Sequence, residues 1–435
     1  MTAIHIPSWL NQHFSNVEPA AEPQWLADFR KHHRDNFLKT GLPSRRQERW
    51  KYTNLACLEN KKFIVAKPFT TIEKNWYEKT KACRAASFEN HFVVCVNGFY
   101  APSLSQLEKL PTGIIICSLQ TAIHQYPELV KKHWPQQQFD IDHYPFANLN
   151  AAFAHDGLFL YVSDHCKIDL PIHIVSITTD HYESVTHPHH ILVLGKFSKL
   201  CILEEHVAWS DRASLMNIVT TISVSAGADL EYYKHQQSNR HAICFAHTVI
   251  EQQEDSLVNH VDCSAGSFFI RDDLLIKLNK RGASCSTSSF YRLYQDGQYV
   301  DHHVDIEHRA PYVRSDMLYK GIIDKKSQAV FKGKLYVAPE AKKTCAYQAN
   351  HHLLLANQAE AYSRPELEIY ADDVQCKHGA TTGKLDQEAL FYLRSRGIHY
   401  DDALHILLQG FAYDVMQRIR HEGIRDYIQH HRMVE

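Results

Sequence analysis

Short apolar or alternating runs follow one another through the middle of the chain, starting at about Leu158. Each run spans roughly four to eight residues, which is the usual length of a β-strand. Gly, Asp, Asn and Ser separate the runs and no long helical pattern intervenes, so the pattern does not favour an alternating α/β winding. The expected strands are Leu158–Val162, Ile172–Ile177, Ile191–Leu194, Lys199–Leu203, Ile218–Val224, Leu230–Tyr233, Ala246–Glu251, Leu274–Leu278, Ser289–Leu293, Val300–Glu307, Ser315–Ile323, Ala329–Val337, His352–Leu355 and Glu366–Tyr370.

Two mainly β architectures fit this succession, a β-sandwich and a β-helix solenoid. The strands continue for more than 200 residues without the regular hairpin turns of a sandwich. The pattern therefore favours the solenoid, whose coils stack about 4.8 Å apart. Small residues recur where corners are expected, because glycine accepts a positive φ. They are Ala226-Gly227-Ala228, Ala265-Gly266, Gly282-Ala283 and Gly379-Ala380.

Both ends of the chain carry helical patterns. Trp25, Phe29 and Phe37 share one face at helical spacing, between a start at Glu22-Pro23 and an end at Gly41. Further helices are expected over Leu119–Trp134 and Tyr144–Ala154, and Phe92–Gly98 predicts a strand with an Asn-Gly turn. We therefore divide the chain into an α-rich N-terminal region (1–157), a β core (158–384) and a helical C-terminal region (385–435).

The C-terminal region predicts two helices. Asp386 can cap the first, which Gly397 ends, and the second should run from about Asp401 to His421. Its apolar stripe, at i, i+4 spacing, is Leu407, Phe411, Val415 and Ile419. Such a stripe either packs on the core or docks a partner, and the pattern leaves both open.

Composition narrows the possible partners. The chain has 47 basic and 49 acidic residues, so neither a nucleic-acid surface nor an anionic-membrane surface is implied. The longest apolar runs are too short to span a bilayer, and Met1–Pro7 does not resemble a secretory signal. The 11 cysteines are scattered with no Cys-x-x-Cys pair, which indicates reduced thiols and a cytoplasmic protein.

Two polar runs suggest a phosphate-binding loop and a metal site, but their residues favour neither interpretation. Gly379–Leu385 resembles a phosphate-binding loop, but only three residues separate its glycines and Leu385 replaces the hydroxyl ligand, so we expect no bound nucleotide. In Asp301–His308, one strand face would carry His302, Val304, Ile306 and His308. A metal site is conceivable there, although a polar outer face of a half-buried strand is the favoured reading. No order of residues indicates a catalytic nucleophile.

Cys376 and His378 form the more informative pair. They are two residues apart, so on a strand their side chains point the same way. Thiolate and imidazole both suit iron and zinc. Two donors cannot complete a four-coordinate site, so any metal bound here needs ligands from elsewhere, most naturally from a second chain.

The run Pro365–Thr381, continuing to Phe391–Ile398, resembles the C-terminal signature of the SufB/SufD family of iron–sulfur cluster assembly scaffold proteins. Within the family, Cys376-Lys377-His378-Gly379-Ala380-Thr381 is similar to the pattern of SufD-type chains, whereas SufB-type chains tend to carry Glu-His-Glu-Ala. The resemblance covers nearly the whole chain. Other segments that carry it are Glu48–Leu55, Val96–Phe99, Leu149–Phe153, Val330–Val337 and Gln348–Leu355.

This resemblance implies a right-handed parallel β-helix flanked by helical regions, in a non-catalytic scaffold subunit. It further implies a SufB-like partner, a SufC-like ATPase that hydrolyses ATP, and a transient iron–sulfur cluster shared at the partner interface and not held stably by this chain alone. His378 matches the histidine implicated at that interface, and Cys376 matches its neighbouring cysteine. The helices over about 386–430 match the region that docks the ATPase. A homodimer is the alternative assembly of the isolated chain.

Two other readings remain open. One is a SufB-type subunit that carries the main cluster ligand, which the missing Glu-His-Glu-Ala pattern disfavours. The other is a stand-alone β-helical metalloenzyme that uses the Asp301–His308 run.

Overall fold

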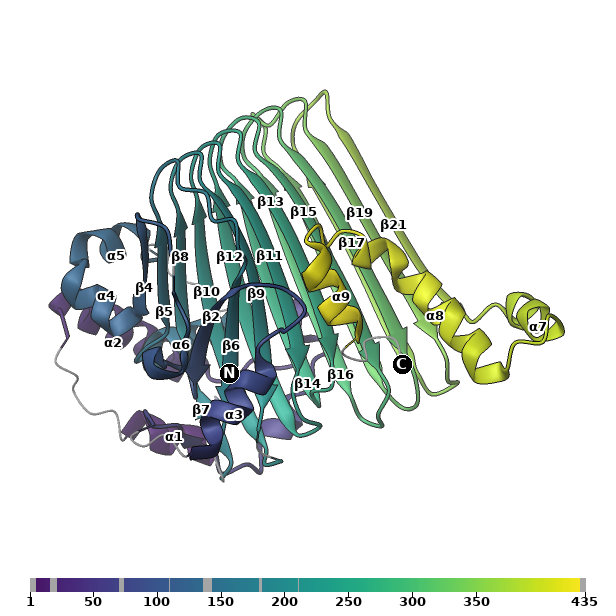
Figure 1. Cartoon of the computed structure of the whole chain (residues 1–435), viewed down its shortest axis with the longest axis horizontal. Coiled ribbons are helices and arrows are strands. Elements are labelled where there is room, and N and C mark those ends of the chain that lie inside the picture. The colour runs from purple at the N-terminus through teal and green to yellow at the C-terminus, as the bar shows by residue number, and fades with distance from the viewer. Residues whose placement is uncertain are drawn as a thin grey trace.

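Two long sheets wind together into a parallel β-solenoid in the computed structural model (Figure 1). The structure describes residues 5–15, 22–69, 74–108, 110–135, 143–179, 182–209 and 211–430. The predicted β-helix with helical flanking regions is therefore confirmed. No helix among those described residues is long and apolar enough to cross a membrane.

The first sheet has the order β20-β18-β16-β14-β12-β10-β8-β5-β4, with β7 and β1 joined at the side of β10. All its pairs are parallel except β4 with β5. Its strands are β1 (Ile64–Val65), β4 (Ile114–Ser118), β5 (Leu158–Val162), β7 (Ser184–Thr186), β8 (His189–Leu194), β10 (Ser214–Val224), β12 (Ala242–Gln252), β14 (Phe269–Leu278), β16 (Tyr299–His308), β18 (Gln328–Val337) and β20 (Glu360–Ile369).

The second sheet has the order β21-β19-β17-β15-β13-β11-β9-β6-β2-β3, parallel except for the β2–β3 hairpin. Its strands are β2 (His91–Val96), β3 (Phe99–Tyr100), β6 (Ile172–Thr178), β9 (Lys199–Ala208), β11 (Asp229–Gln237), β13 (Leu257–Ala265), β15 (Ser284–Leu293), β17 (Arg314–Ile323), β19 (Cys345–Leu354) and β21 (Gln375–Lys384). Arg314 pairs with Cys345, which pairs with Gln375, so one coil takes roughly thirty residues.

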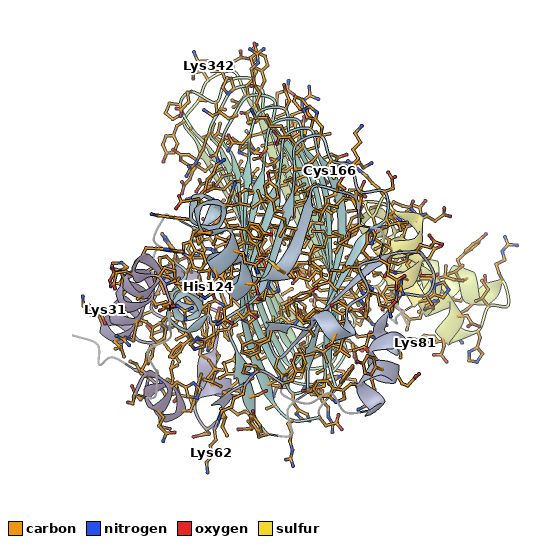
Figure 2. All side chains as sticks on the ribbon, turned by 60° about the vertical axis from the view of Figure 1, so that its left-hand side comes forward. Lys31, Lys62, Lys81, His124, Cys166 and Lys342 are labelled. Carbon is orange, nitrogen blue, oxygen red and sulfur yellow. The ribbon has the colours of Figure 1, made fainter. Side chains whose placement is uncertain are left out.

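Every coil turns from the first sheet to the second through one residue with positive φ. At most of these corners the backbone N–H bonds to the next coil, as in Phe197 N–H to Ala226 O at 3.0 Å and Tyr312 N–H to Lys342 O at 2.9 Å. Lys342 and Cys166, each adjacent to such a corner residue, lie on the same upper side of the molecule although many coils separate them (Figure 2). The corner residues are His165, Phe197, Gly227, Asp255, Gly282, Tyr312, Lys343 and Asp373.

The strands are longer than the apolar runs predicted, because many polar side chains point into the solenoid. Glu204, Tyr232 and Thr287 are all at most 1% exposed and lie beside the apolar core. Such residues interrupt the apolar pattern without ending the strand. For the same reason β13 had no counterpart among the expected strands, and β21, which is rich in polar residues and mostly exposed, had none either.

Helices cover the N-terminal end of the solenoid. α2 begins after Pro23 and ends at Gly41, which has φ 68°, as predicted. The single helix expected over Leu119–Trp134 is wrong: Pro127 lacks an N–H and drives Tyr126 out of the helical region, so α4 and α5 form instead. The helices are α1 (Ser8–Ser15), α2 (Gln24–Thr40), α3 (Lys74–Cys83), α4 (Leu119–Gln125), α5 (Pro127–His133) and α6 (Pro145–Phe153), with 3₁₀ turns η1 (Glu48–Trp50), η2 (Leu55–Leu58) and η3 (Pro102–Leu104).

At the other end the chain leaves β21 as a projecting helical arm and then returns (Figure 1). α7 (Gln387–Ser395) is capped by the Asp386 carboxylate, as predicted. The second helix is shorter than expected, because α8 (Tyr400–Met416) ends in a tight turn at which Ile419 N–H bonds to Met416 O at 3.1 Å. α9 (Glu422–His430) then packs beside α8 on the outer face of the second sheet.

Candidate functional site

The solenoid ends in two strand edges that no described segment covers. β20 and β21 each have a neighbour on one side only, β18 and β19 respectively. Residues of β21 are mostly exposed, whereas β17, two places further in, is almost entirely buried. Unpaired edges of ten residues each are ready templates for another chain.

Cys376 and His378 lie on β21, at this open end. Their register partners, Ala346 and Gln348, point into the solenoid, so both side chains belong to the inner face, as the two-residue spacing predicted. His378 is exposed, while Cys376 is half-buried against the last part of the core. Burial, followed by the nearby Cys345 thiol, raises the pKa of Cys376. Cys376 is therefore a poor thiolate until its surroundings change.

The two side chains do not complete a metal site within the described residues. Among the residues that the structure describes, no third histidine, cysteine or carboxylate joins them in a group whose donor atoms lie within 4.8 Å of one another. Neighbouring histidines are already engaged: His351 Nδ1 lies 2.6 Å from the Thr381 hydroxyl, and His352 Nε2 lies 2.6 Å from the Tyr291 hydroxyl. The pair therefore offers two donors where a cluster or a tetrahedral metal takes four.

The predicted apolar stripe of the C-terminal region divides in the structure. Val415 and Ile419 are fully buried against the second sheet, while Leu407 and Phe411 are half-buried. Phe411 packs beside the Lys320 ammonium, which lies 5.2 Å from its ring. The stripe therefore serves mainly to hold the arm on the solenoid.

Other apolar side chains of the arm face solvent, and the sequence reading missed them. Phe391 is 73% exposed on α7, and Tyr413 and Ile406, on α8, are 58% and 44% exposed. Ile406 and Tyr413 are seven residues apart, so they share a helical face, and that spacing was the available signal. We call Phe391, Tyr392, Ile406 and Tyr413 the arm surface.

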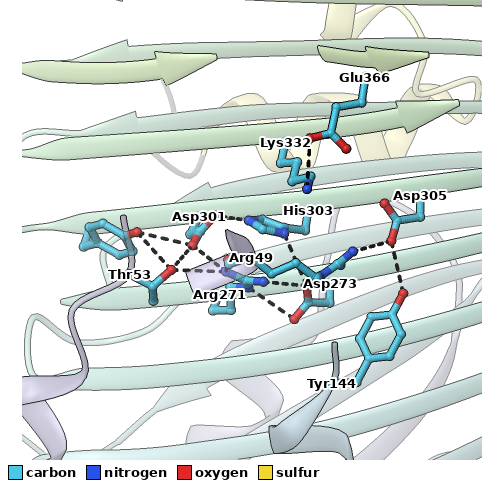
Figure 3. A network of polar contacts seen from close by, with 11 residues as sticks. Arg49, Thr53, Tyr144, Arg271, Asp273, Asp301, His303, Asp305, Lys332 and Glu366 are labelled. Carbon is cyan, nitrogen blue, oxygen red and sulfur yellow. Dashed lines mark hydrogen bonds and ion pairs between the residues drawn. The ribbon is translucent and has the colours of Figure 1, made fainter. Parts of the chain in front are cut away.

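A buried network of charges fixes the N-terminal segment to the outer face of the first sheet (Figure 3). Arg49 reaches Asp305 through Nη1 at 2.8 Å and Asp273 through Nη2 at 3.4 Å. Tyr144 donates its hydroxyl to the same Asp305 carboxylate at 3.1 Å. The segment Glu48–Leu55 is thereby attached to β14 and β16.

Arg271 forms the centre of the network. Its guanidinium reaches Asp301 at 2.7 Å and Asp273 at 3.0 Å, and lies 4.3 Å from the Trp50 ring. His303 Nε2 lies 3.0 Å from the other oxygen of Asp301. Burial would raise the pKa of Asp301, but the Arg271 charge, with His303, holds it well below its usual range.

The Asp301–His308 run thus has two different faces, as its alternation predicted. His302, Val304, Ile306 and His308 point inward. The favoured reading of the other face, a polar surface on a half-buried strand, is wrong in one respect. Asp301 and His303 are at most 3% exposed, because the N-terminal segment covers them.

A cleft of about 940 Å³ lies beside this network on the outer face of the first sheet. Charges of both signs line it and pair within it: Lys277 lies 3.1 Å from Glu251, and Lys334 lies 2.8 Å from Glu368. The cleft therefore presents no strong charge of one sign to a ligand.

Comparisons with known proteins cover nearly the whole chain. Residues 176–411 match the family model described as SUF system FeS cluster assembly, SufBD core domain, and residues 10–174 match the SufBD protein N-terminal region. The chain is 29% identical over 399 residues to the iron–sulfur cluster assembly protein SufD of Escherichia coli, covering 91% of this chain and 90% of that relative. It is also 29% identical to a SufBD family protein of Synechocystis, over 87% of this chain and 84% of the relative. SufD of Bacillus subtilis is 22% identical, with 94% and 93% covered.

Proposed function

Because the chain belongs to the SufB/SufD family of iron–sulfur cluster assembly proteins and is SufD-like in sequence, we propose that it is a non-catalytic scaffold subunit of a cytoplasmic complex. It pairs with a SufB-like chain and binds a SufC-like ATPase, and a nascent cluster forms between the two paired scaffolds. The observation that carries the proposal is the open end of the solenoid, where Cys376 and His378 lie on an unpaired strand.

The free edges supply the means of pairing. Gln375 N–H bonds to Thr344 O at 2.9 Å, so the odd-numbered residues of β21 direct their backbone groups to β19. Cys376, His378 and the other even-numbered residues direct theirs to the open edge. A strand from a SufB-like chain can add to this edge by backbone hydrogen bonds. Without such a chain, the same edges can pair two copies.

Pairing places the inner-face side chains of β21 at the boundary between the chains. His378 supplies an imidazole there, and the partner supplies thiolates, the usual ligands of iron–sulfur clusters. The cluster is the cargo of the complex and is not a resident cofactor. Cys376, half-buried with a raised pKa, becomes a ligand only when the interface opens.

The arm supplies the ATPase contact. The arm surface exposes aromatic and aliphatic side chains, the composition of a protein-binding patch. The base of the arm is tied to the core, since Lys320 Nζ lies 2.7 Å from Asp414 and Arg418 lies 3.1 Å from Asp316. Movement of a bound ATPase is thereby transmitted to β17, close to the open end, and opens the interface to sulfur and iron.

The decisive experiment is co-expression with SufB-like and SufC-like chains, followed by mass measurement of the intact assembly and assay of cluster formation. His378→Ala should leave the assembly mass unchanged and abolish most cluster formation. Lys377→Ala, on the same strand but facing outward, is the matched control. Full cluster formation by the His378 variant would remove this residue from the mechanism.

A second pair of variants tests the edge. Ala380→Pro deletes an N–H that faces the open edge and breaks no bond to β19. The variant should remain folded and fail to pair with the SufB-like chain, while Ala380→Val should pair normally. Normal pairing by the proline variant would show that the partner docks elsewhere.

A further inference from the structure

A second group of metal-ligating side chains lies deep inside the solenoid, away from the open end. Asp272 of β14 and His302 of β16 are direct register partners on adjacent strands. Asp262 points towards them from β13, in the opposite sheet. One donor atom from each of the three residues lies within 4.8 Å of the other two, and all three residues are at most 7% exposed. Three donors this close can share one ion.

Several polar atoms of this group are left unsatisfied by the protein. Within the described chain, Asp272 Oδ1 and His302 Nε2 have no hydrogen-bond partner. The same holds for Nε2 of His260, which lies on the same face of β13 as Asp262 and is 2% exposed. Leaving buried polar atoms unpaired destabilises the fold, because their bonds to water are lost and not replaced. Such atoms are uncommon unless something else binds them.

The charges of the group point to a cation. Lys234 Nζ lies 2.8 Å from Asp272 Oδ2 and so balances one of the two carboxylates. The Asp262 Oδ2 atom accepts hydrogen bonds from Ser264 at 2.8 Å and Ser289 at 3.1 Å, which leaves its negative charge in place. A water molecule would satisfy the free atoms but not this buried charge.

The His302 imidazole is suited to be a ligand. Within the described chain its Nε2 atom has no protein partner, so this ring nitrogen is available to a metal. A neutral ring nitrogen is the form that binds a metal. Carboxylates together with imidazole suit divalent ions such as Mn²⁺, Fe²⁺ and Zn²⁺.

We propose that Asp262, Asp272 and His302 bind one divalent first-row transition-metal ion inside the solenoid. This site is separate from the cluster position, because β16 and β14 lie two and three places in from β20, and β13 lies four places in from β21, the strand that carries Cys376 and His378. The ion joins the two sheets across the interior of the solenoid and stabilises the coils that surround it.

Manganese is the probe, because Mn²⁺ has little affinity for the 11 thiols of the chain. The full chain is produced in manganese-supplemented cells and, separately, unfolded in chelator and refolded with Mn²⁺, since the site is enclosed. Bound metal is counted after exhaustive dialysis, and its electron paramagnetic resonance spectrum is recorded. The wild type should hold one Mn²⁺ per chain with a spectrum distinct from that of the hydrated ion.

Two variants and one control give the readout. His302→Gln and Asp262→Asn should each weaken retention at least tenfold. His308→Gln should retain the metal, because His308 points inward from the same strand but already contacts Tyr336 O at 2.9 Å and Ser315 at 2.8 Å. The proposal fails if wild-type protein from both routes holds no Mn²⁺, or if both site variants hold as much as the wild type.

Discussion

Tyr427 of the last helix donates its hydroxyl to Glu205 of β9, at 3.2 Å from Oε1 and 3.0 Å from Oε2. The same carboxylate lies 3.1 Å from His173 Nε2 and 3.0 Å from His235 Nδ1. All four side chains are at most 8% exposed. α9 is therefore fastened to early coils of the solenoid by a buried charged group, not by apolar contact alone.

Removing this hydroxyl should loosen the last helix. A hydrogen bond to a charged group contributes about 1.5–3 kcal/mol, so Tyr427→Phe should lower the free energy of unfolding by about 2 kcal/mol. Urea denaturation gives that value, and hydrogen exchange should show faster exchange in α9. Tyr413→Phe, 58% exposed on α8, is the control and should change little. Equal stability of the two variants would contradict the role given to Tyr427.

Buried histidines should make the protein sensitive to mild acid. Burial lowers the pKa values of His308 and His352 to about 4, although each would titrate near 6.5 in the unfolded chain. The unfolded state therefore binds more protons as pH falls from 6.5 to 4. Stability is fully present above pH 6.5 and declines through that window, by at most about 3 kcal/mol for each such group.

Urea midpoints measured from pH 8 to pH 5 test this expectation. His352→Gln keeps a polar group beside the Tyr291 hydroxyl and removes one titrating ring. The variant should lose less stability than the wild type between pH 7 and pH 5. Parallel pH dependences would show that His352 titrates alike in both states.

Arg271 should be the most sensitive residue of the anchoring network. Deleting one partner of a buried ion pair costs about 3–5 kcal/mol, because the other charge stays buried. Arg271→Met leaves Asp301 and Asp273 without this cation. We expect a loss of about 4 kcal/mol in urea and faster tryptic cleavage around Arg45–Lys51.

The control for that variant is Arg309→Met. The Arg309 side chain is 38% exposed and pairs with Glu307, also near the surface. Exposed pairs contribute about 0–1 kcal/mol. Similar losses in both variants would mean that the network contributes no more than surface charges do.

The arm surface can be separated from the arm's own packing. Phe391→Glu changes a side chain that is 73% exposed, so unfolding should be unaffected while binding of a purified SufC-like ATPase weakens at least tenfold. Tyr77→Glu, on the distant helix α3 and 52% exposed, controls for added charge. Calorimetric titration measures both. Unchanged ATPase binding by the Phe391 variant would exclude this surface.

Leu407→Glu with Phe411→Glu is a weaker test of docking than the sequence alone suggests. Both side chains are half-buried, and Phe411 contacts the core. The double variant should lower stability as well as binding, and the two losses must be measured together. A loss of binding without a loss of stability would place the docking surface on this stripe after all.

Much of the architecture could be predicted from the sequence, because apolar residues recur at different spacings in strands and in helices. The run Leu158–Val162 predicted β5 residue for residue. Prediction failed where polar side chains face inward. Glu204 and Lys234 have the polarity expected at a strand end, although both are buried inside the solenoid. It also failed at corners: glycine marks Gly227 and Gly282, but Phe197 and Tyr312 adopt the same positive φ because the hydrogen bonds of the next coil hold them there.

Parts of the candidate site could likewise be predicted from local strand geometry, whereas parts that depend on tertiary packing could not. A spacing of two placed Cys376 and His378 on one face, since that depends only on strand geometry. The sequence could not show which apolar face of the C-terminal helices is buried and which is exposed, because tertiary packing decides that. Asp262, Asp272 and His302 were out of reach for another reason: two sheets bring them together, and no local pattern links them.

The uncovered edges of β20 and β21 bear on how the protein must be made in a cell. If the proposed partner covers these edges, chains made in excess of it would expose unpaired strand edges to one another and would stack or aggregate. The proposal therefore requires balanced production of this chain and its partner.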